Sequence, residues 1–256
     1  MNAEIVLEGF REHRRSLLWW SFGLIIFTAI TLVFYPSMRD STGLSAYSKD
    51  LPEAMRAMFV GGELDLTSPS GFLNSQIFAV MAPTLLAIFA VSTGASAIAG
   101  DEERGLLDQR LAQPVSRTSV VIQQFLWLSA GVLILTIVLL ATVGLGGRPF
   151  DLNVNFMNLL AISVSTGLFG LLFGVMSLAV GCVIPGKSRA VAVAAAVATL
   201  SWIIDGLAKS VSWLEPVQDF SPYHQAYGAS PLLNGIPWGG WAILAAITAS
   251  LVAISI

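Results

Sequence analysis

The chain has 256 residues, of which 55% are hydrophobic and only 11% are charged. A soluble domain carries about 25% charged residues to cover its surface, so this composition excludes a soluble fold and indicates a membrane protein. The formal net charge of −3 lacks the basic excess of a nucleic-acid-binding protein. The single cysteine, Cys182, excludes an intramolecular disulfide and a multi-cysteine metal cluster, and the two histidines are too far apart in sequence to suggest a metal pair.

Six long stretches that are nearly free of charge predict six membrane-spanning helices. A spanning helix needs about 20 consecutive apolar residues. The Ala-rich fifth stretch gives the weakest signal, because Asp205 lies near its far end. We therefore expect an all-α integral membrane protein in which residues 1–256 form one transmembrane domain. The predicted spans are about 17–35, 74–99, 119–144, 156–184, 190–208 and 238–256.

The segment before the first predicted span, residues 1–16, is expected to form an amphipathic helix at the membrane surface. Val6, Phe10 and Leu17 lie near one face of such a helix, and a helix with one apolar and one charged face binds in the plane of a membrane. A plain polar tail is the alternative. The apolar run that follows is longer than the core of a signal peptide and lacks a small-x-small cleavage site, so we expect an uncleaved first span.

The lysine and arginine residues of the loops indicate which side of the membrane each loop faces. Cytoplasmic loops carry an excess of these residues close to the ends of the spans. With a cytoplasmic N-terminus, eight of the 13 lie in the inner segments, and five lie in longer outer segments. We therefore expect both termini in the cytoplasm. The inner residues are Arg11, Arg14, Arg15, Arg104, Arg110, Arg117, Lys187 and Arg189, and the outer ones are Arg39, Lys49, Arg56, Arg148 and Lys209.

Several residues in the predicted spans suggest how the helices bend and pack. Pro83 predicts a kink in the second span, where the carbonyl that it frees needs another hydrogen-bond donor. Gly170 and Gly174 form a Gly-x-x-x-Gly pair, which favours close packing of the fourth span, more within the chain than in a dimer. Asp205 and Lys209 are four residues apart, which favours a mutual ion pair over an ion-transport site.

Two outer segments carry turn signals. Ser68 followed by Pro69 predicts a helix N-cap with proline at the first helical position. The proline-containing segment 209–237, before the last span, predicts a short broken or re-entrant element.

Residues 181–188 fit the phosphate-loop pattern G-x-x-x-x-G-K-[ST]. A phosphate loop follows a short buried strand, and its backbone N–H groups hold the phosphates. Here the preceding apolar run has the length of a membrane helix, and Pro185 removes one N–H. We therefore interpret the match as a tight inner loop, and we expect no ATPase activity in this chain.

An intramembrane protease is the enzyme that competes with this interpretation. Ser96 lies in Gly-Ala-Ser-Ala-Ile, which lacks the second glycine of the serine-hydrolase motif. A glutamate protease of the prenyl-protease-like type needs Glu-Glu-x-x-x-Arg, but Leu107 follows Glu102-Glu103 at the arginine position, and only His224 lies near a later helix. Both types lack required residues. A membrane scaffold without transport activity is a further alternative.

The strongest local signal lies between the second and third predicted spans, at residues 98–117. Acidic residues at 101–103 suit a helix N-terminus, where the helix dipole is positive. Leu107 and Leu111 then fall on one face at helical spacing, and Pro114 ends the helix. A short amphipathic helix with an exposed apolar stripe can enter a groove on a soluble partner. A surface helix packed on the bilayer is the alternative.

These residues resemble the permease subunits of ABC transporters of the ABC-2 type, which often carry E-x-G-T-L-x-x-L-L-x-x-P-[VI]-S-R after the second span. Leu106 and Arg110 depart from that pattern, which leaves the docking interpretation intact and makes the partner surface specific to this system. The N-terminal segment, the six spans, the large first outer loop and Ser-Pro-Tyr-His at 221–224 also resemble this family. The matching positions are Glu103, Gly105, Leu107, Leu111, Pro114, Val115, Ser116 and Arg117.

The resemblance implies a transport subunit without an ATPase of its own. The expected partners are a soluble ABC ATPase, a second permease copy or a related permease, and membrane lipids. ATP and magnesium would bind to the ATPase, so no cofactor or metal is expected in this chain. The implied function is export across the cytoplasmic membrane, in a prokaryotic cell. The coupling loop would be 100–118, with ATPase-coupling residues Glu102, Glu103, Gly105, Leu107, Leu111, Pro114 and Arg117.

Overall fold

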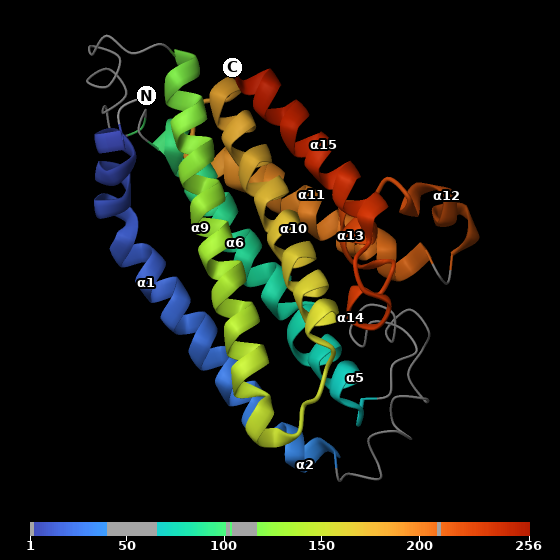
Figure 1. Cartoon of the computed structure of the whole chain (residues 1–256). Coiled ribbons are helices and arrows are strands. Elements are labelled where there is room, and N and C mark those ends of the chain that lie inside the picture. The colour runs from blue at the N-terminus through green and yellow to red at the C-terminus, as the bar shows by residue number, and fades with distance from the viewer. Residues whose placement is uncertain (1–2, 40–65, 101–102, 104–116, 209–210) are drawn as a thin grey trace.

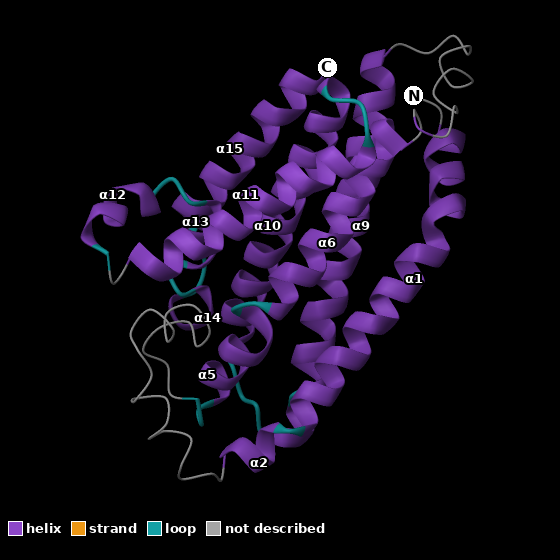
Figure 2. Ribbon diagram, turned by 180° about the vertical axis from the view of Figure 1, so that it is seen from behind, coloured by secondary structure: helices purple, strands orange, loops and turns teal. Residues whose placement is uncertain are grey.

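The structure of the chain, a computed structural model, describes residues 3–39, 66–100, 103, 117–208 and 211–256. Within these ranges all regular structure is helical and no strand occurs (Figure 2). Six helices are long and apolar enough to cross a membrane, with mean hydropathies of 1.6 to 2.5 over their best windows. The all-α fold with six spans is therefore confirmed. The spanning segments are Arg14–Arg39, Pro69–Gly100, Thr118–Phe150, Phe156–Val183, Lys187–Ala208 and Trp238–Ser255.

The elements follow one another as an up-and-down bundle (Figure 1). Some of the short helices lie at the end of the molecule opposite the two termini, and others lie beside the bundle at mid-height. In chain order the helices are α1 (Ala3–Val33), α2 (Tyr35–Arg39), α5 (Pro69–Leu73), α6 (Met81–Ala95), α9 (Arg117–Gly146), α10 (Phe156–Val183), α11 (Lys187–Ala208), α12 (Glu215–Gln218), α13 (Pro222–Tyr227), α14 (Pro231–Asn234) and α15 (Trp238–Ser255). Two π-helical segments, η2 (Asn74–Phe78) and η3 (Ser96–Gly100), and two 3-10 turns, η4 (Arg148–Phe150) and η5 (Ser212–Leu214), complete them.

Helix α10 is the central element of the bundle. In its most apolar 18-residue window 72% of the residues are buried, against 22% in the first span and 11% in α15. Small residues allow its backbone to approach α6 closely, since a Cβ added to Gly94 of α6 would overlap the carbonyl oxygen of Gly174. Such contact between small residues is how membrane helices gain van der Waals energy. The glycine pair thus packs within the chain, as predicted.

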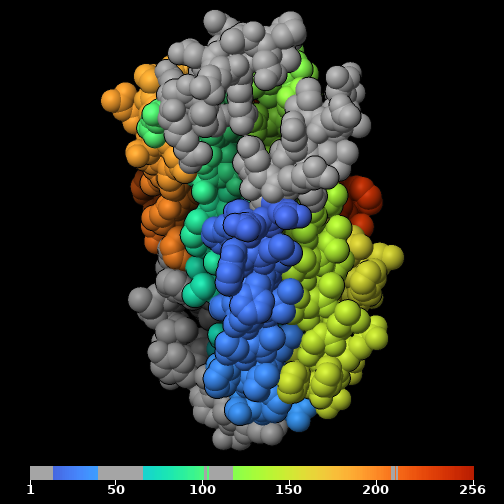
Figure 3. Space-filling model, turned by 90° about the vertical axis from the view of Figure 1, so that its left-hand side faces the viewer, coloured from blue at the N-terminus to red at the C-terminus, as the bar shows by residue number. Residues whose placement is uncertain are grey.

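Helix α1 lies at the edge of the bundle, against α9 and the second span. Figure 3 shows it in blue, with α6 on one side and α9 on the other. Its outward side chains are large and apolar, including Trp19 at 73% exposed and Leu18 at 67%. A soluble protein does not expose a continuous apolar surface of this kind, whereas a lipid-facing helix does. The surface therefore agrees with a membrane location.

The N-terminal segment is helical from Ala3 onward and continues into the first span as a single helix, α1. The sequence predicted a separate surface helix over residues 1–16, followed by a span. The helix is present, but no break separates it from the span. A junction between two separate helices requires residues that leave the helical conformation, which proline and glycine favour. The sequence contains neither between Phe10 and Phe22, so the helix continues through this segment.

The second span is interrupted one turn before Pro83. Ser68 caps α5 through a hydrogen bond from the Gly71 N–H to its hydroxyl, as predicted. The π-helical η2 follows, and the helical path then breaks at Val80, where φ is −134°. Proline cannot donate the bond that residue 83 would send to residue 79. The predicted kink therefore occurs at the position where this bond is missing.

The segment between α11 and α15 is a chain of short helices. Three of them, α12, α13 and α14, each begin with a proline at the first or second position. They pack against α10 and α11 rather than forming one long helix (Figure 1). The broken element predicted for residues 209–237 is thus present in the part of the segment that the structure describes.

Candidate functional site

The predicted coupling residues fall largely outside the described part of the chain. Glu103 is described, with an exposed side chain, and Arg117 begins α9. Glu102, Gly105, Leu107, Leu111 and Pro114 lie outside the described residues. Their role in binding an ATPase remains a prediction.

Glu103 contacts the turn between α10 and α11. Its Oε1 accepts a hydrogen bond from the backbone N–H of Lys187 at 2.9 Å, and the two residues are 84 positions apart. Lys187 is the first residue of α11, where N–H groups lack helical partners and the dipole favours a negative charge. The carboxylate therefore caps α11, and it ties the segment after the second span to the start of the fifth.

The run that fits the phosphate-loop pattern, residues 181–188, consists of a helix end, a turn and a helix start. Gly181 to Val183 end α10, a 28-residue helix, and Gly186 takes a left-handed φ of 106° before α11 begins. The element before this turn is a membrane helix and not a strand. The structure thus agrees with the interpretation of this run as a tight turn and not a phosphate loop, while the side of the membrane that it faces stays a prediction.

An apolar cavity of about 350 Å³ lies between α6 and α11. Its walls include Pro83, Thr84 and Ile88 on α6 and Ala195 and Thr199 on α11. Neither wall contributes a charged side chain. Concave apolar sites of this size are where proteins bind small molecules or the apolar part of larger ones.

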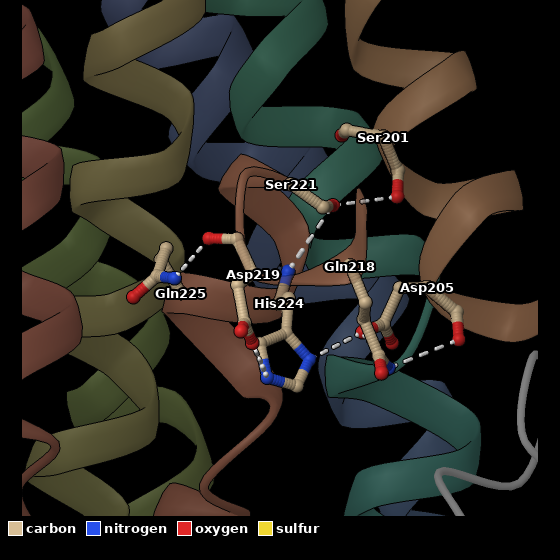
Figure 4. Close-up of polar contacts among 7 residues, drawn as sticks. All are labelled: Ser201, Asp205, Gln218, Asp219, Ser221, His224 and Gln225. Atoms are coloured by element: carbon tan, nitrogen blue, oxygen red, sulfur yellow. Dashed lines mark hydrogen bonds and ion pairs between the residues drawn. The ribbon is translucent and has the colours of Figure 1, made fainter. Parts of the chain in front are cut away.

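A polar cluster joins α13 to α11 at one end of this cavity (Figure 4). The His224 Nδ1 lies 2.7 Å from Oδ1 of Asp205, and Gln218 donates to the same oxygen at 3.0 Å. The Asp205 side chain is only 14% exposed. A carboxylate so far removed from water needs such donors. The sequence predicted Lys209 as the partner of Asp205, but Lys209 lies outside the described residues, and the described partners come from α12 and α13.

Two more contacts connect α13 to the bundle. The Ser221 hydroxyl donates to the Ser201 carbonyl of α11 at 2.8 Å. The Tyr223 hydroxyl donates to the Ala79 carbonyl of the second span at 2.7 Å, in a buried position. This is the carbonyl that Pro83 leaves without a helical donor. The freed carbonyl predicted from the sequence therefore has its partner in Tyr223.

The tyrosines of α13 form an aromatic cluster with α10. The rings of Tyr223 and Tyr227 lie 4.6 Å apart, and Phe169 meets Tyr223 edge-on at 5.8 Å. Burial raises the pKa of Tyr223 well above its usual value, and the nearby Tyr227 and Asp205 raise it further. Burial also raises the pKa of Tyr227, and the hydrogen bond to Thr166, which lowers this pKa, offsets only part of the effect. Both hydroxyls therefore stay protonated and act as donors.

A second, smaller pocket of about 60 Å³ adjoins this cluster. Asp205, Gln218 and His224 line it, and it shares Ala79 and Tyr223 with the apolar cavity. Tyr223 thus lies between an apolar space and a polar one. Among the described residues no group of three or more His, Cys, Asp or Glu side chains is arranged to hold a metal ion.

Helix α10 anchors the rest of the C-terminal region through polar side chains. Asn158 donates to the Leu232 and Leu233 carbonyls at the end of α14, at 3.0 and 2.9 Å. The Trp241 indole of α15 donates to the Ser165 hydroxyl at 2.9 Å. These bonds hold the short helices and the last span against the most buried helix of the bundle.

Comparison with known proteins agrees with this architecture. Residues 3–252, nearly the whole chain, match the family described as ABC-2 family transporter protein. No curated protein and no solved structure matches the chain significantly.

Proposed function

The chain belongs to the ABC-2 family of transporter membrane proteins, and on this premise we propose that it is the permease of an exporter driven by a separate ABC ATPase. As a member of this family it is a membrane component of a transporter and a multi-pass membrane protein. The observation that carries the proposal is the family match over residues 3–252, which includes all six spans.

The contact between Glu103 and α11 supports a coupling role for residues 100–118. A docked ATPase that changes shape on binding ATP would pull or push this segment. Because Glu103 caps α11 through Lys187, the displacement would reach α11 directly. α11 is one wall of the apolar cavity. ATP binding to the ATPase can move α11 between two positions only if the contacts made by α11 differ between the two states. The bond from Lys187 to Glu103 is a contact of this kind.

The remaining parts of the proposal concern orientation and assembly. The coupling segment faces the cytoplasm, as the distribution of lysine and arginine favours, and both termini lie on the same side. The protein works as a dimer with a second copy or a related permease, in the cytoplasmic membrane of a prokaryotic cell. The apolar cavity between α6 and α11 is the surface that cargo contacts.

The test is co-purification with the partner ABC ATPase that the proposed function requires. Leu107→Asp places a charge on the predicted docking stripe, and Glu103→Ala removes the cap of α11. We expect Leu107→Asp to lower the amount of bound ATPase about tenfold or more, as loss of an interface hot spot does. Glu103→Ala should retain more ATPase but uncouple ATP hydrolysis from transport.

Glu215→Ala is the matched control, because Glu215 is an exposed acid on α12, which follows the end of α11 and lies outside the coupling segment. Its co-purification should equal that of the parent chain. Undiminished binding and coupling in both Leu107→Asp and Glu103→Ala would contradict the assignment of the coupling segment.

A further inference from the structure

Tyr223 supplies the hydrogen bond that Pro83 removes from α6. The Ala79 carbonyl has no helical donor, because residue 83 has no N–H. The Tyr223 hydroxyl donates to it at 2.7 Å from an element 144 residues away. In a membrane an unsatisfied carbonyl is strongly unfavourable. The position of α6 at its break therefore depends on α13.

The same short helix also holds α11. Ser221 donates to the Ser201 carbonyl at 2.8 Å, and His224 lies 2.7 Å from Asp205. Residues 221 and 224 thus contact α11, while residue 223 contacts the second span. These two spans are the walls of the apolar cavity. α13 therefore connects the two walls, and Figure 4 shows its contacts with Ser201 and Asp205 of α11.

The Ala79 carbonyl has a second possible donor. It lines the polar pocket of about 60 Å³ beside the cavity, which is large enough for a water molecule. Water entering that pocket can replace the tyrosine hydroxyl at nearly equal enthalpy. The contact between α13 and α6 can therefore break without unfolding either helix, and this is the property that a moving part of a transporter requires.

We propose that Tyr223 is a positioning residue for transport, whose hydroxyl ties the bent α6 to α11 through α13 and so limits the width of the cavity. The proposal rests on the proposed function, in which the cavity is the cargo-contacting surface. When the hydroxyl releases Ala79, α6 moves away from α11 and the cavity widens. The bond is thus made in one state of the transporter and broken in the other.

Tyr227 provides a matched control on the same helix. Its hydroxyl donates to Thr166 of α10 at 2.9 Å, and its ring stacks on that of Tyr223. Thr166 in turn donates to the Ile162 carbonyl of its own helix. Tyr227→Phe therefore removes the same chemical group from the same aromatic cluster, but it releases nothing on α6 or α11.

The experiment measures the separation of the two walls by cross-linking. Cys182→Ser removes the only cysteine, and Thr84→Cys with Thr199→Cys then places one thiol on each wall of the cavity. Bifunctional thiol reagents of graded length report how often the walls approach each other. The measurement needs neither cargo nor an ATPase, so its failure is distinct from a failure of the proposed function.

We expect Tyr223→Phe to lower the cross-linking rate of the shortest reagent about fivefold, the change in an equilibrium that one net hydrogen bond supports. Ser221→Ala, which releases the α11 side, should change the rate in the same direction and carries the test if Tyr223→Phe does not fold. Tyr227→Phe should leave the rate within about twofold of the parent. An unchanged rate in Tyr223→Phe or Ser221→Ala, or an equal fall in Tyr227→Phe, would overturn the proposal.

Discussion

At the scale of single residues, the two tyrosines of α13 must remain protonated to donate their hydrogen bonds. Burial raises the pKa of both above the usual 10.0. The folded protein therefore disfavours tyrosinate more than the unfolded chain does. The resulting stability is fully present below pH 10 and is lost as the pH rises past that value toward the folded-state pKa.

This gives a prediction for the pH dependence of thermal unfolding in detergent. The unfolding temperature should not vary with pH on account of these tyrosines between about pH 7 and 9, and it should fall above about pH 10 as the unfolded chain ionises. The double variant Tyr223→Phe/Tyr227→Phe should show a smaller fall over the alkaline range. An equally steep fall in that variant would show that these tyrosines do not carry the effect.

The sequence predicts the acceptor of the hydrogen bond between α13 and the second span, but it does not predict the donor. Pro83 alone shows that a carbonyl one turn earlier needs a donor, because proline chemistry is local. The donor, Tyr223, comes from 144 residues away, and only the packing of α13 brings it there. Asp205 is similar, since its described partners, Gln218 and His224, come from the short helices that follow α11.

At the scale of elements, α10 and α6 are held together by close backbone contact. A Cβ on Gly174 would lie 2.8 Å from the Ala90 Cβ and 3.0 Å from the Ala90 carbonyl oxygen. Neither neighbour is a flexible side chain that could move aside. The two spans would have to separate to accept even a methyl group.

We therefore predict that Gly174→Ala destabilises the protein by about 1–3 kcal/mol, the usual effect of overpacking. Gly23→Ala is the control, because no atom lies within 4 Å of an added Cβ there and alanine has the higher helix propensity. Thermal unfolding of the purified proteins, followed by tryptophan fluorescence, compares the two. Equal stability of both variants would show that the α6–α10 contact is looser than the structure has it.

Hydrophobic runs predict the six spans because most residues that face lipid or the bundle interior are apolar. They do not predict where a helix is interrupted by non-local contacts. The second span divides into α5, η2, α6 and η3, and the break at Val80 is stabilised from α13. The sequence also does not predict that residues 3–16 and the first span form one helix, α1. The charge pattern indicates which residues face water or lipid, but it does not show where a helix begins or ends.

At the scale of the whole molecule, the turn between α10 and α11 lies at one end of the spans, where it meets Glu103, and α5 and α14 lie at the opposite end (Figure 1). The short helices α12 and α13 lie between the two ends, beside α11 and α15. A cavity between α6 and α11 lies between these ends.

The predicted orientation can be tested with single cysteines in the Cys182→Ser chain. Arg189→Cys marks the exposed start of α11, and Glu215→Cys marks the exposed α12, which follows the other end of α11. With the termini in the cytoplasm, a membrane-impermeant thiol reagent should label Glu215→Cys in intact cells and Arg189→Cys only in inverted vesicles. The reverse pattern would place the coupling segment outside the cell and exclude a cytoplasmic ATPase.

The central claim is that this chain is a transport subunit driven by an ATPase that it does not contain. The most direct measurement is ATP hydrolysis in lipid nanodiscs by this chain alone, by the isolated partner ABC ATPase that the proposed function requires, and by the two together. We predict no hydrolysis by the chain alone, and a rate for the complex that differs from that of the isolated ATPase and returns to it with Leu107→Asp. Hydrolysis by the chain alone, or an ATPase rate that the chain does not change, would contradict the account.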